Sequence, residues 1–286
     1  MSGMVINSNI PSITAQRHLA NSRTEMEQAM ERLSSGKRIN SAMDDAAGLT
    51  IAHSLDSKVT SLNQAARNAN DGVSLINLAE GALDQVSAML TRMRSLAIQS
   101  INGTYSDDDR DNLHLEFQAL NDEITRIANN TKFNGVQVIG ASATITFQVG
   151  HTSSDTISLL TEKMQSTYLA SVGGSGFHLD DAAISTVGST TLVNTAKGSL
   201  ARIDAAISEV DSYRAKLGAA GNRLEHSAAN LYTRVENQMA ARSRIEDADY
   251  AVEAANLARA QILQQAGTAM LSQANATGAT ILSLLK

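Results

Sequence analysis

A heptad repeat of apolar residues constrains the fold of this chain more than any other feature of its sequence. Apolar side chains recur in alternating steps of four and three residues from Leu55, and the repeat continues after a shift near residues 79–83. Its members are Leu55, Val59, Leu62, Ala66, Ala69, Val73 and Ile76, followed by Leu90, Met93 and Ala97. Such spacing places one apolar stripe along an α-helix that packs against a partner helix. We expect a helix over about 46–100, roughly 80 Å long at the α-helical rise per residue.

A second heptad segment in the C-terminal part supplies a partner. It begins near Ala196 and contains Ile203, Ile207, Val210, Leu217, Leu224, Leu231 and Val235. A helix there could lie antiparallel to the first and share its seam, which makes a helical bundle. A third helix is expected after Ser106, where acidic residues favour a helix N-terminus. Its core face is Leu113, Phe117, Leu120, Ile124 and Ile127.

The middle of the chain has a different period. Residues 144–149 and 156–160 alternate apolar and polar side chains and are predicted to be two paired strands. The region that follows, to about residue 195, is rich in Ser, Thr and Gly and is expected to form surface loops.

Both ends of the chain lack charged side chains over long stretches. Residues 2–16 carry none, and neither do residues 260–285, although their apolar residues fall at helical intervals. Polar residues are spread through the second stretch, so it is not expected to insert into a membrane. Two uncharged, amphipathic ends indicate surfaces that are buried only when other copies of the chain arrive.

The break after the first helix has its own signals. The sequence Ser34-Ser35-Gly36 is typical of a helix end. Ser41 and Asp44 have the spacing of a capping box, and we expect them to open the long helix. The doublet Asp44-Asp45 is then a helix-start feature rather than a catalytic pair, because neighbouring residues of a helix point to different faces.

Composition excludes several classes of function. The net charge of −6 does not suit a protein that binds nucleic acid. Aromatic residues make up only 3% of the chain, so its cores must be thin and built from Ala, Leu, Ile, Val and Met. The absence of cysteine excludes disulfides and thiolate sites. The N-terminus lacks the basic start and apolar run of a secretory signal peptide, so export would need another route.

No pattern in the sequence predicts an active site. The six histidines are scattered without the spacing of metal ligands, and no phosphate-binding glycine loop follows a strand. We therefore predict no enzymatic activity, no metal and no cofactor.

Five motifs carry a family likeness. Residues 33–49 (LSSGKRINSAMDDAAGL), 64–72 (QAARNANDG) and 79–83 (AEGAL) closely resemble the N-terminal signature of bacterial flagellin. Residues 243–250 (SRIEDADY) and 259–267 (RAQILQQAG) resemble its C-terminal signature. The likeness covers about 1–140 and about 195–286.

The resemblance implies a mainly α fold in three parts. Residues 1–44 and 245–286 would form the paired terminal helices, D0, which build the inner tube of a filament. Residues 45–140 and 195–244 would form the antiparallel coiled-coil rod, D1, with a small β-hairpin. Residues 141–194 would be a short hairpin and loop region in place of large outer domains.

The resemblance also implies the function and the partners. The chain would be a self-assembling structural subunit of the extracellular flagellar filament, which serves swimming motility. It would be exported unfolded by the flagellar type III apparatus, with a chaperone on its C-terminal helix, and would meet the filament cap and hook-junction proteins. The predicted assembly residues of the terminal helices are Leu19, Met26, Met30, Leu33, Val252, Leu257, Ile262, Leu263, Leu271, Ile281 and Leu285.

A further implied partner is an innate immune receptor of animals. The family positions for that contact correspond to Arg92, Leu96 and Glu116. Without the family, Arg92 and Glu116 would be charges on a solvated helix face, and Leu96 a neighbour of the seam.

Three rival interpretations remain from the sequence. The nearest is a hook–filament junction protein, which has similar ends but makes short rings. A cytoplasmic coiled-coil adaptor would form a small oligomer with ordered termini. An enzyme is the third, against which stands the lack of any catalytic constellation.

Overall fold

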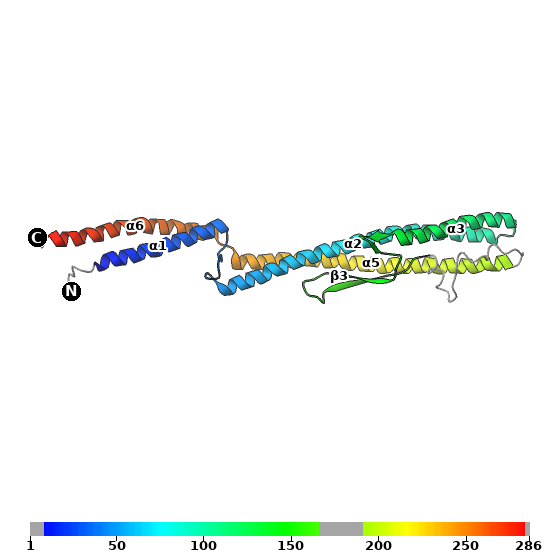
Figure 1. Ribbon diagram of the computed structural model, residues 1–286, viewed down its shortest axis with the longest axis horizontal. Coiled ribbons are helices and arrows are strands. Elements are labelled where there is room, and N and C mark those ends of the chain that lie inside the picture. The colour runs from blue at the N-terminus through cyan, green and yellow to red at the C-terminus, as the bar shows by residue number, and fades with distance from the viewer. Residues whose placement is uncertain (1–8, 166–190, 284–286) are drawn as a thin grey trace. The chain divides into compact units, whose positions relative to one another are not determined.

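The computed structural model describes residues 9–165 and 191–283, and within them the chain is mainly α-helical (Figure 1). The helices are α1 (Ile10–Ser35), α2 (Ala46–Ile101), α3 (Asp107–Asn130), α5 (Thr191–Glu246) and α6 (Tyr250–Ser283). The strands are β1 (Lys132–Phe133), β2 (Val136–Gln137), β3 (Ala143–Gln148) and β4 (Thr156–Thr161). The predicted fold class is confirmed. No helix within the described ranges has both the length and the apolar character needed to cross a lipid bilayer.

The contacts divide the chain into two units. One consists of Met1–Val59 with Glu236–Lys286, and the other of Thr60–Val235. The first is called the terminal unit below and the second the core unit. The D0 and D1 boundaries expected from the sequence follow the helix breaks instead, and they stay a prediction.

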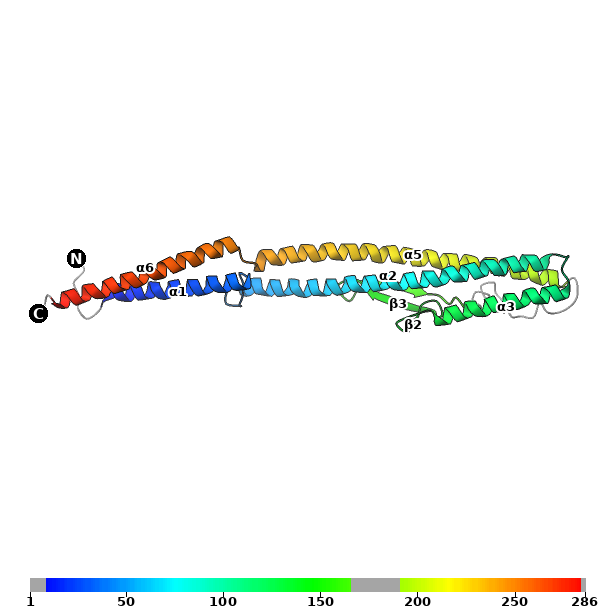
Figure 2. The same ribbon diagram turned by 90° about the horizontal axis from the view of Figure 1, so that it is seen from above.

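The core unit is built on the seam that α2 and α5 share. The two helices lie side by side and antiparallel in both views (Figures 1 and 2). The heptad residues meet there, because one apolar cluster buries residues of both helices: Ala69, Ile76, Leu90 and Met93 of α2 and Ile203, Val210, Leu217 and Leu224 of α5. Leu62 of α2 is also fully buried. The predicted seam is confirmed because the heptad spacing keeps these side chains on one face of each helix.

Helix α3 follows α2 after a short turn and packs on the seam between α2 and α5. Phe117 and Ile124 are buried in the core cluster, as predicted. Ser106 and Asp109 form a reciprocal capping box at its start, with Ser106 Oγ accepting from the Asp109 backbone N–H at 3.2 Å. Arg110 is buried, and its guanidinium donates to the Ser100 and Asn102 carbonyls at 3.1 and 3.4 Å. It therefore satisfies carbonyl groups at the C-terminal end of α2 that have no helical partner.

Two hairpins follow α3. In the short β1–β2 hairpin, Asn134 and Gly135 both have positive φ angles of 49° and 83°, which a two-residue hairpin turn of this kind requires. No strands were predicted at these particular residues, although Asn-Gly is the usual signal of such a turn. The predicted β3–β4 pair is confirmed to within one residue at each end. Its Ile157 and Leu159 are buried and face the helices, whereas Ser158 and Leu160 are exposed.

A glycine lets the second hairpin approach the helix seam. A Cβ atom at Gly72 of α2 would lie 2.8 Å from Leu224 Cδ1 and 3.2 Å from the Phe147 ring. Any larger residue at position 72 would therefore force both neighbours apart.

The start of α2 differs from the expectation. Asp45, not Ser41, caps the helix, because its Oδ1 accepts from the Gly48 backbone N–H at 2.8 Å. The Asp44 carboxylate turns back and accepts from the Asn40 and Ser41 backbone N–H groups at 3.1 and 2.9 Å. These backbone donors hold the pKa of Asp44 below its ordinary value. Both carboxylates therefore serve the turn between α1 and α2.

Candidate assembly surface

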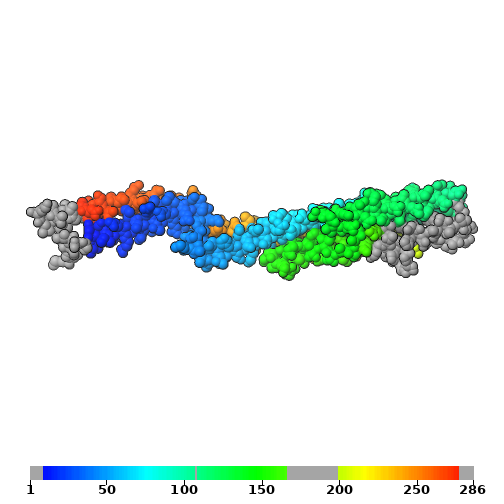
Figure 3. Space-filling model, viewed as in Figure 1, coloured from blue at the N-terminus to red at the C-terminus, as the bar shows by residue number. Residues whose placement is uncertain are grey.

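The two helices of the terminal unit have well-defined inner ends and run antiparallel. Gly36 ends α1 in the left-handed conformation, at φ 71°, with its N–H donating to the Arg32 carbonyl at 2.9 Å. Asp249 caps α6, because its Oδ1 accepts from the Ala251 and Val252 backbone N–H groups at 2.9 and 3.2 Å. At the outer end, Asn9 caps α1 and accepts from the Ser12 N–H at 3.2 Å. α1 and α6 lie side by side (Figures 1 and 3).

Their seam follows the heptad rule but holds small or half-buried side chains. On α1 the inward positions are Ser12, Ala15, Leu19, Ser22, Met26, Ala29 and Leu33. On α6 they are Glu253, Leu257, Ala260, Gln264, Gly267, Leu271 and Ala274. Of these fourteen, only Ser12, Ser22, Ala29, Glu253 and Ala260 are buried. The pair buries little apolar surface between its own two helices.

Large apolar side chains lie outside this seam. Ile10, Ile13, Ile262 and Met270 are each at least 60% exposed. A groove of about 600 Å³ runs between the two helices, and Ile10, Leu19, Leu263 and Met270 are among the side chains that line it. A groove with apolar walls and an exposed apolar rim is typical of surfaces that take up another apolar segment.

The predicted assembly residues fall into two groups. Leu19, Met26, Leu33, Leu257 and Leu271 are half-buried in the seam. Met30, Val252, Ile262 and Leu263 are exposed by 44%, 52%, 65% and 45%. The Ile281 side chain and Leu285 lie outside the described residues.

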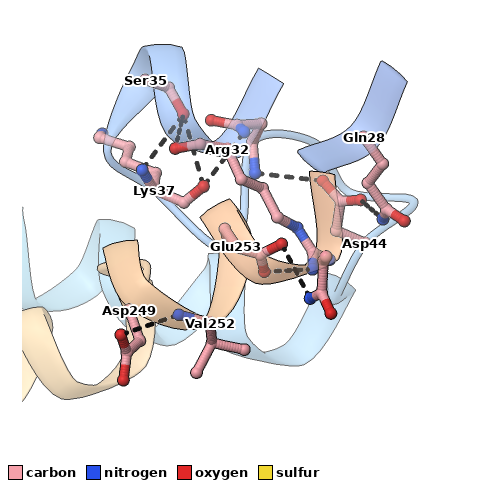
Figure 4. Close-up of polar contacts among 10 residues, drawn as sticks. Gln28, Arg32, Ser35, Lys37, Asp44, Asp249, Val252 and Glu253 are labelled. Atoms are coloured by element: carbon pink, nitrogen blue, oxygen red, sulfur yellow. Dashed lines mark hydrogen bonds and ion pairs between the residues drawn. The ribbon is translucent and has the colours of Figure 1, made fainter. Parts of the chain in front are cut away.

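Backbone and side-chain contacts join the two linkers at the inner end of the helix pair. The Ala248 N–H donates to the Gly36 carbonyl at 2.9 Å, and the Arg38 N–H donates to the Glu246 carbonyl at 2.6 Å. Lys37 also forms an ion pair with Glu246. The neighbouring Arg32 of α1 and Glu253 of α6 point toward each other and pair at 3.0 Å (Figure 4). The chain therefore enters and leaves the helix pair at one tied point.

The residues expected at a receptor contact lie in the core unit. Arg92 and Glu116 form a bidentate ion pair across α2 and α3, at 2.7 and 3.0 Å, and both are exposed. The hydrogen bonds that Arg92 donates to Glu116, and the negative charge of Glu116, raise the pKa of Arg92 above its ordinary value. Leu96 is only 2% exposed and belongs to the core cluster. The structure brings Arg92 and Glu116 together at the surface and places Leu96 beneath it.

No set of three His, Asp or Glu side chains among the described residues could hold a metal ion.

Sequence reasoning missed Glu253, Gly267 and Asn275 as contact residues of α6. Glu253 is 7% exposed, a Cβ at Gly267 would lie 3.2 Å from Leu19 Cδ1, and Asn275 Oδ1 accepts from Ser12 Oγ at 2.9 Å. Glu253 and Gly267 lie at heptad positions of α6, but neither is a large apolar residue, and the predicted assembly residues of α6 are all large and apolar.

Two family models match the two ends of the chain. The bacterial flagellin N-terminal helical region matches residues 6–144, and the bacterial flagellin C-terminal helical region matches residues 200–285.

Two similar proteins match over nearly the whole of both chains. A flagellin of Halalkalibacterium halodurans is 42% identical over 284 residues, covering 99% of this chain and 100% of that protein. The flagellar filament 33 kDa core protein of Treponema phagedenis is 37% identical over 286 residues, covering 99% and 100%. A solved structure assigned to the flagellar hook-associated proteins, from Vibrio parahaemolyticus, has a TM-score of 0.62 at 18% identity and covers 71% of this chain and all of that one. At that identity it shows a shared fold only.

Proposed function

The chain belongs to the bacterial flagellin family and is a structural subunit of the flagellar filament, and we propose that its α1–α6 pair is the surface through which copies assemble. Motility is implied by the family. The hook–filament junction alternative is not favoured, because the full-length relatives at 37–42% identity are filament proteins. Since flagellins are structural proteins, we propose no catalytic role.

The observation that supports this proposal is that the outward faces of the two terminal helices carry larger apolar side chains than the faces they turn toward each other. Their mutual seam is made of small or half-buried side chains, whereas Ile13, Ile262 and Met270 face outward at 60%, 65% and 64% exposure. Exposed apolar area of this kind gives about 25 cal/mol for each Å² that another copy covers. Most of the apolar burial available to α1 and α6 is therefore intermolecular.

Folding of the ends would then be coupled to assembly. The helix pair has too little internal burial to offset the entropy of ordering the two segments on its own. Neighbouring copies supply the missing contacts, so the ends order as the filament grows. A contact between different surfaces of identical copies repeats without closing and produces a helical polymer.

Removal of residues 260–286 tests the proposal. The truncated chain should keep the melting transition of the core unit but should form no sedimentable filament. Normal filaments from the truncated chain would exclude α6 as an assembly element. Limited proteolysis of the full-length monomer adds a second measure: both ends should be trimmed while residues of about 50–240 resist. Equal resistance of the ends would contradict coupled folding and would favour an adaptor with ordered termini.

We propose the family's domain plan for the same surface. Residues 1–44 and 245–286 would form D0, the inner tube, and residues 45–140 and 195–244 would form D1. The uncharged stretch of α6 supports this assignment, because a buried unpaired charge in the wall of a tube would be costly.

The route and partners of assembly are part of the proposal. The protein would be secreted unfolded through the flagellar export apparatus and would work outside the cell. A chaperone would cover α6 before export, because α6 exposes Ile262, Leu263 and Met270. Cap and hook-junction proteins would receive the subunit. A pull-down of the flagellar chaperone with the full chain and with the chain lacking residues 260–286 tests the α6 assignment.

Recognition by an animal innate immune receptor is proposed at Arg92 and Glu116. Both are exposed and paired on adjacent helices, so a receptor would meet them as one polar unit. Leu96 would support the surface from below. Binding of the receptor ectodomain to Arg92→Ala and Glu116→Ala, compared with the wild-type chain, checks this. Unchanged affinity in both variants would contradict it.

A further inference from the structure

The side chains of the seam between α1 and α6 do not by themselves select one register, and the backbone bonds Gly36–Ala248 and Arg38–Glu246 hold only its inner end. Its inward positions repeat every seven residues with small or half-buried side chains, such as Ser22 and Ala29 on α1 and Ala260 and Gly267 on α6. A slip of one heptad would exchange these for side chains of similar size. In coiled coils, a uniform apolar seam permits such slips, and a single buried polar residue is what selects one register.

Arg32 and Glu253 are an ion pair placed on this seam. Arg32 Nη1 lies 3.0 Å from Glu253 Oε1, and Asn256 Nδ2 donates to the other carboxylate oxygen at 3.3 Å. The Glu253 side chain is 9% exposed and that of Arg32 23%. Among the described residues, this is the ion pair that joins α1 to α6; the remaining charges of the two helices, such as Arg23 and Arg259, are exposed.

A slip in either direction separates this pair. In one direction, the heptad shift places Glu253 opposite Glu25, and Arg32 opposite Glu246, which is already the partner of Lys37. In the other direction, Arg32 faces Ala260 and Glu253 faces Ile39. Each slipped state leaves a charge without its partner on the seam or sets two carboxylates against each other. Either outcome is strongly unfavourable for a partly buried group.

A second polar contact marks the same register at the outer end. Ser12 Oγ donates to Asn275 Oδ1 at 2.9 Å, and Asn9 Nδ2 donates to the Ala274 carbonyl at 2.9 Å. These contacts are neutral and near the chain ends, so they are weaker than the charged pair.

We propose that the Arg32–Glu253 ion pair selects the register of α6 against α1 and thereby specifies which surface each copy presents to its neighbours. The proposal rests on the proposed role of the α1–α6 pair in assembly. The pair contributes specificity rather than affinity, since the apolar contacts with other copies supply the binding energy.

Disulfide crosslinking in assembled filaments reports the register directly. The chain has no cysteine of its own, so only an introduced pair can form the disulfide. A Cβ at Gly267 would lie 3.8 Å from Leu19 Cβ, within the range of about 3.5–4.5 Å that a disulfide needs. The pair Leu19→Cys with Gly267→Cys therefore reports the observed register. Leu19→Cys with Ala260→Cys and Leu19→Cys with Ala274→Cys report the two slipped registers.

In the otherwise wild-type chain, only the Leu19→Cys, Gly267→Cys pair should crosslink on oxidation. With Glu253→Gln or Arg32→Ala added, the share of slipped crosslinks should rise about tenfold, which corresponds to a loss of register preference of about 1.4 kcal/mol. The exchange Arg32→Glu with Glu253→Arg should restore the single crosslink. The control is Arg23→Ala with Glu27→Ala, an exposed ion pair within α1 that should leave the pattern unchanged.

A single crosslink that survives in both Glu253→Gln and Arg32→Ala filaments would overturn the proposal. If either variant forms no filament, filament formation is measured for the double variant Arg32→Glu with Glu253→Arg. Recovery of filaments in the double variant supports the proposal, and failure to recover overturns it. Since the crosslink is read in the filament, it does not depend on whether the ends are ordered in the monomer. Failure of the assembly proposal is seen separately, as normal filaments from the chain that lacks residues 260–286.

Discussion

The core unit and the terminal unit use the same heptad rule with different side chains. In the core unit, Leu83, Leu90, Met93, Tyr213 and Leu217 are fully buried, and two hairpins and α3 add further cover. In the terminal unit, the inward positions hold Ser, Ala, Gly, half-buried Leu, Met and Gln, and the paired Glu253. No inward position of α1 or α6 has a large, fully buried apolar side chain among the described residues.

This difference indicates whether the contacts that stabilise each pair of helices come from the same chain or from other copies. A fully buried Leu contributes about 1.5–3 kcal/mol relative to an exposed one, so the core unit has within one chain what it needs to fold. The terminal unit keeps its large apolar groups on the outside, where they are available to other copies. One sequence period thus serves intramolecular folding in one unit and, as we propose, intermolecular folding in the other.

The largest expected effect is on the core seam. Leu217→Ala removes a fully buried side chain and should lower the free energy of unfolding by about 2–5 kcal/mol. Leu115→Ala is the matched control, because that leucine is 64% exposed and its loss should change stability by less than about 0.5 kcal/mol. Denaturant unfolding of the monomer, followed by circular dichroism, measures both. Similar losses in the two variants would remove the distinction between seam and surface.

For α6, we expect a substitution to weaken assembly without lowering the stability of the monomer. Ile262→Ala should leave the stability of the monomer unchanged, because the side chain is 65% exposed. It should raise the critical concentration for filament growth about tenfold, since burial of an isoleucine in the filament is worth about 1.5–3 kcal/mol. Sedimentation of filaments at several protein concentrations measures this. Leu160→Ala, which changes an exposed leucine of β4, is the control; an equal rise there would show that assembly is not specific to the terminal helices.

The same contrast explains what the sequence could predict. The heptads of α2 and α5 predicted their helices, their shared seam and the buried residues, because large apolar side chains at a regular spacing have one way to be buried. The short β1–β2 hairpin was missed, since its strands have two residues each and only Asn134-Gly135 marks it. The N-cap of α2 was assigned to Ser41 instead of Asp45, because both positions carry capping residues and the local turn decides between them.

The candidate surface was predicted in part. The outward Ile262 and Leu263 could be found from the uncharged stretch. The ion pair of the inward Glu253 could not, because its partner Arg32 lies more than 200 positions away in the sequence. Hydrogen-bond partners at that separation are set by tertiary register and not by local pattern.

A smaller effect within the core unit depends on pH. Tyr213 is buried, and desolvation raises the pKa of its hydroxyl to about 12. The folded state therefore keeps this proton while the unfolded chain releases it near its ordinary value of 10. Stability from this group is present below pH 10 and declines as the pH rises toward 12. Tyr213→Phe should lose about 1 kcal/mol at pH 7, because the bond to the Val138 carbonyl at 3.3 Å is lost.

The Tyr213→Phe variant should also lose part of the decline between pH 10 and 12. Thermal unfolding at several pH values between 10 and 12 measures how steeply stability falls with pH. Tyr232→Phe is the control, because Tyr232 is 53% exposed. An unchanged slope in Tyr213→Phe would show that its hydroxyl ionises equally in the folded and unfolded chain.

The smallest expected effect compares the helix caps of the two units. Ser106→Ala removes the cap of α3 and should lower the stability of the monomer by about 1 kcal/mol, because Ser106 Oγ accepts from the Asp109 N–H. The Ser106 hydroxyl and backbone also hold the pKa of Asp109 below its ordinary value. Stability from Asp109 is therefore present above about pH 4 and is lost as the pH falls, and Ser106→Ala should flatten that acid dependence.

Asn9→Ala removes the corresponding cap of α1, where Asn9 accepts from Ser12 N–H and donates to the Ala274 carbonyl. If α1 orders only in the filament, this variant should leave the melting temperature of the monomer unchanged and should raise the critical concentration for growth by a few fold. A cap contributes stability only to a helix that is formed in the state being measured. A lower melting temperature in the Asn9→Ala monomer would mean that α1 is already folded before assembly, and the two units would then differ in packing alone and not in when they fold.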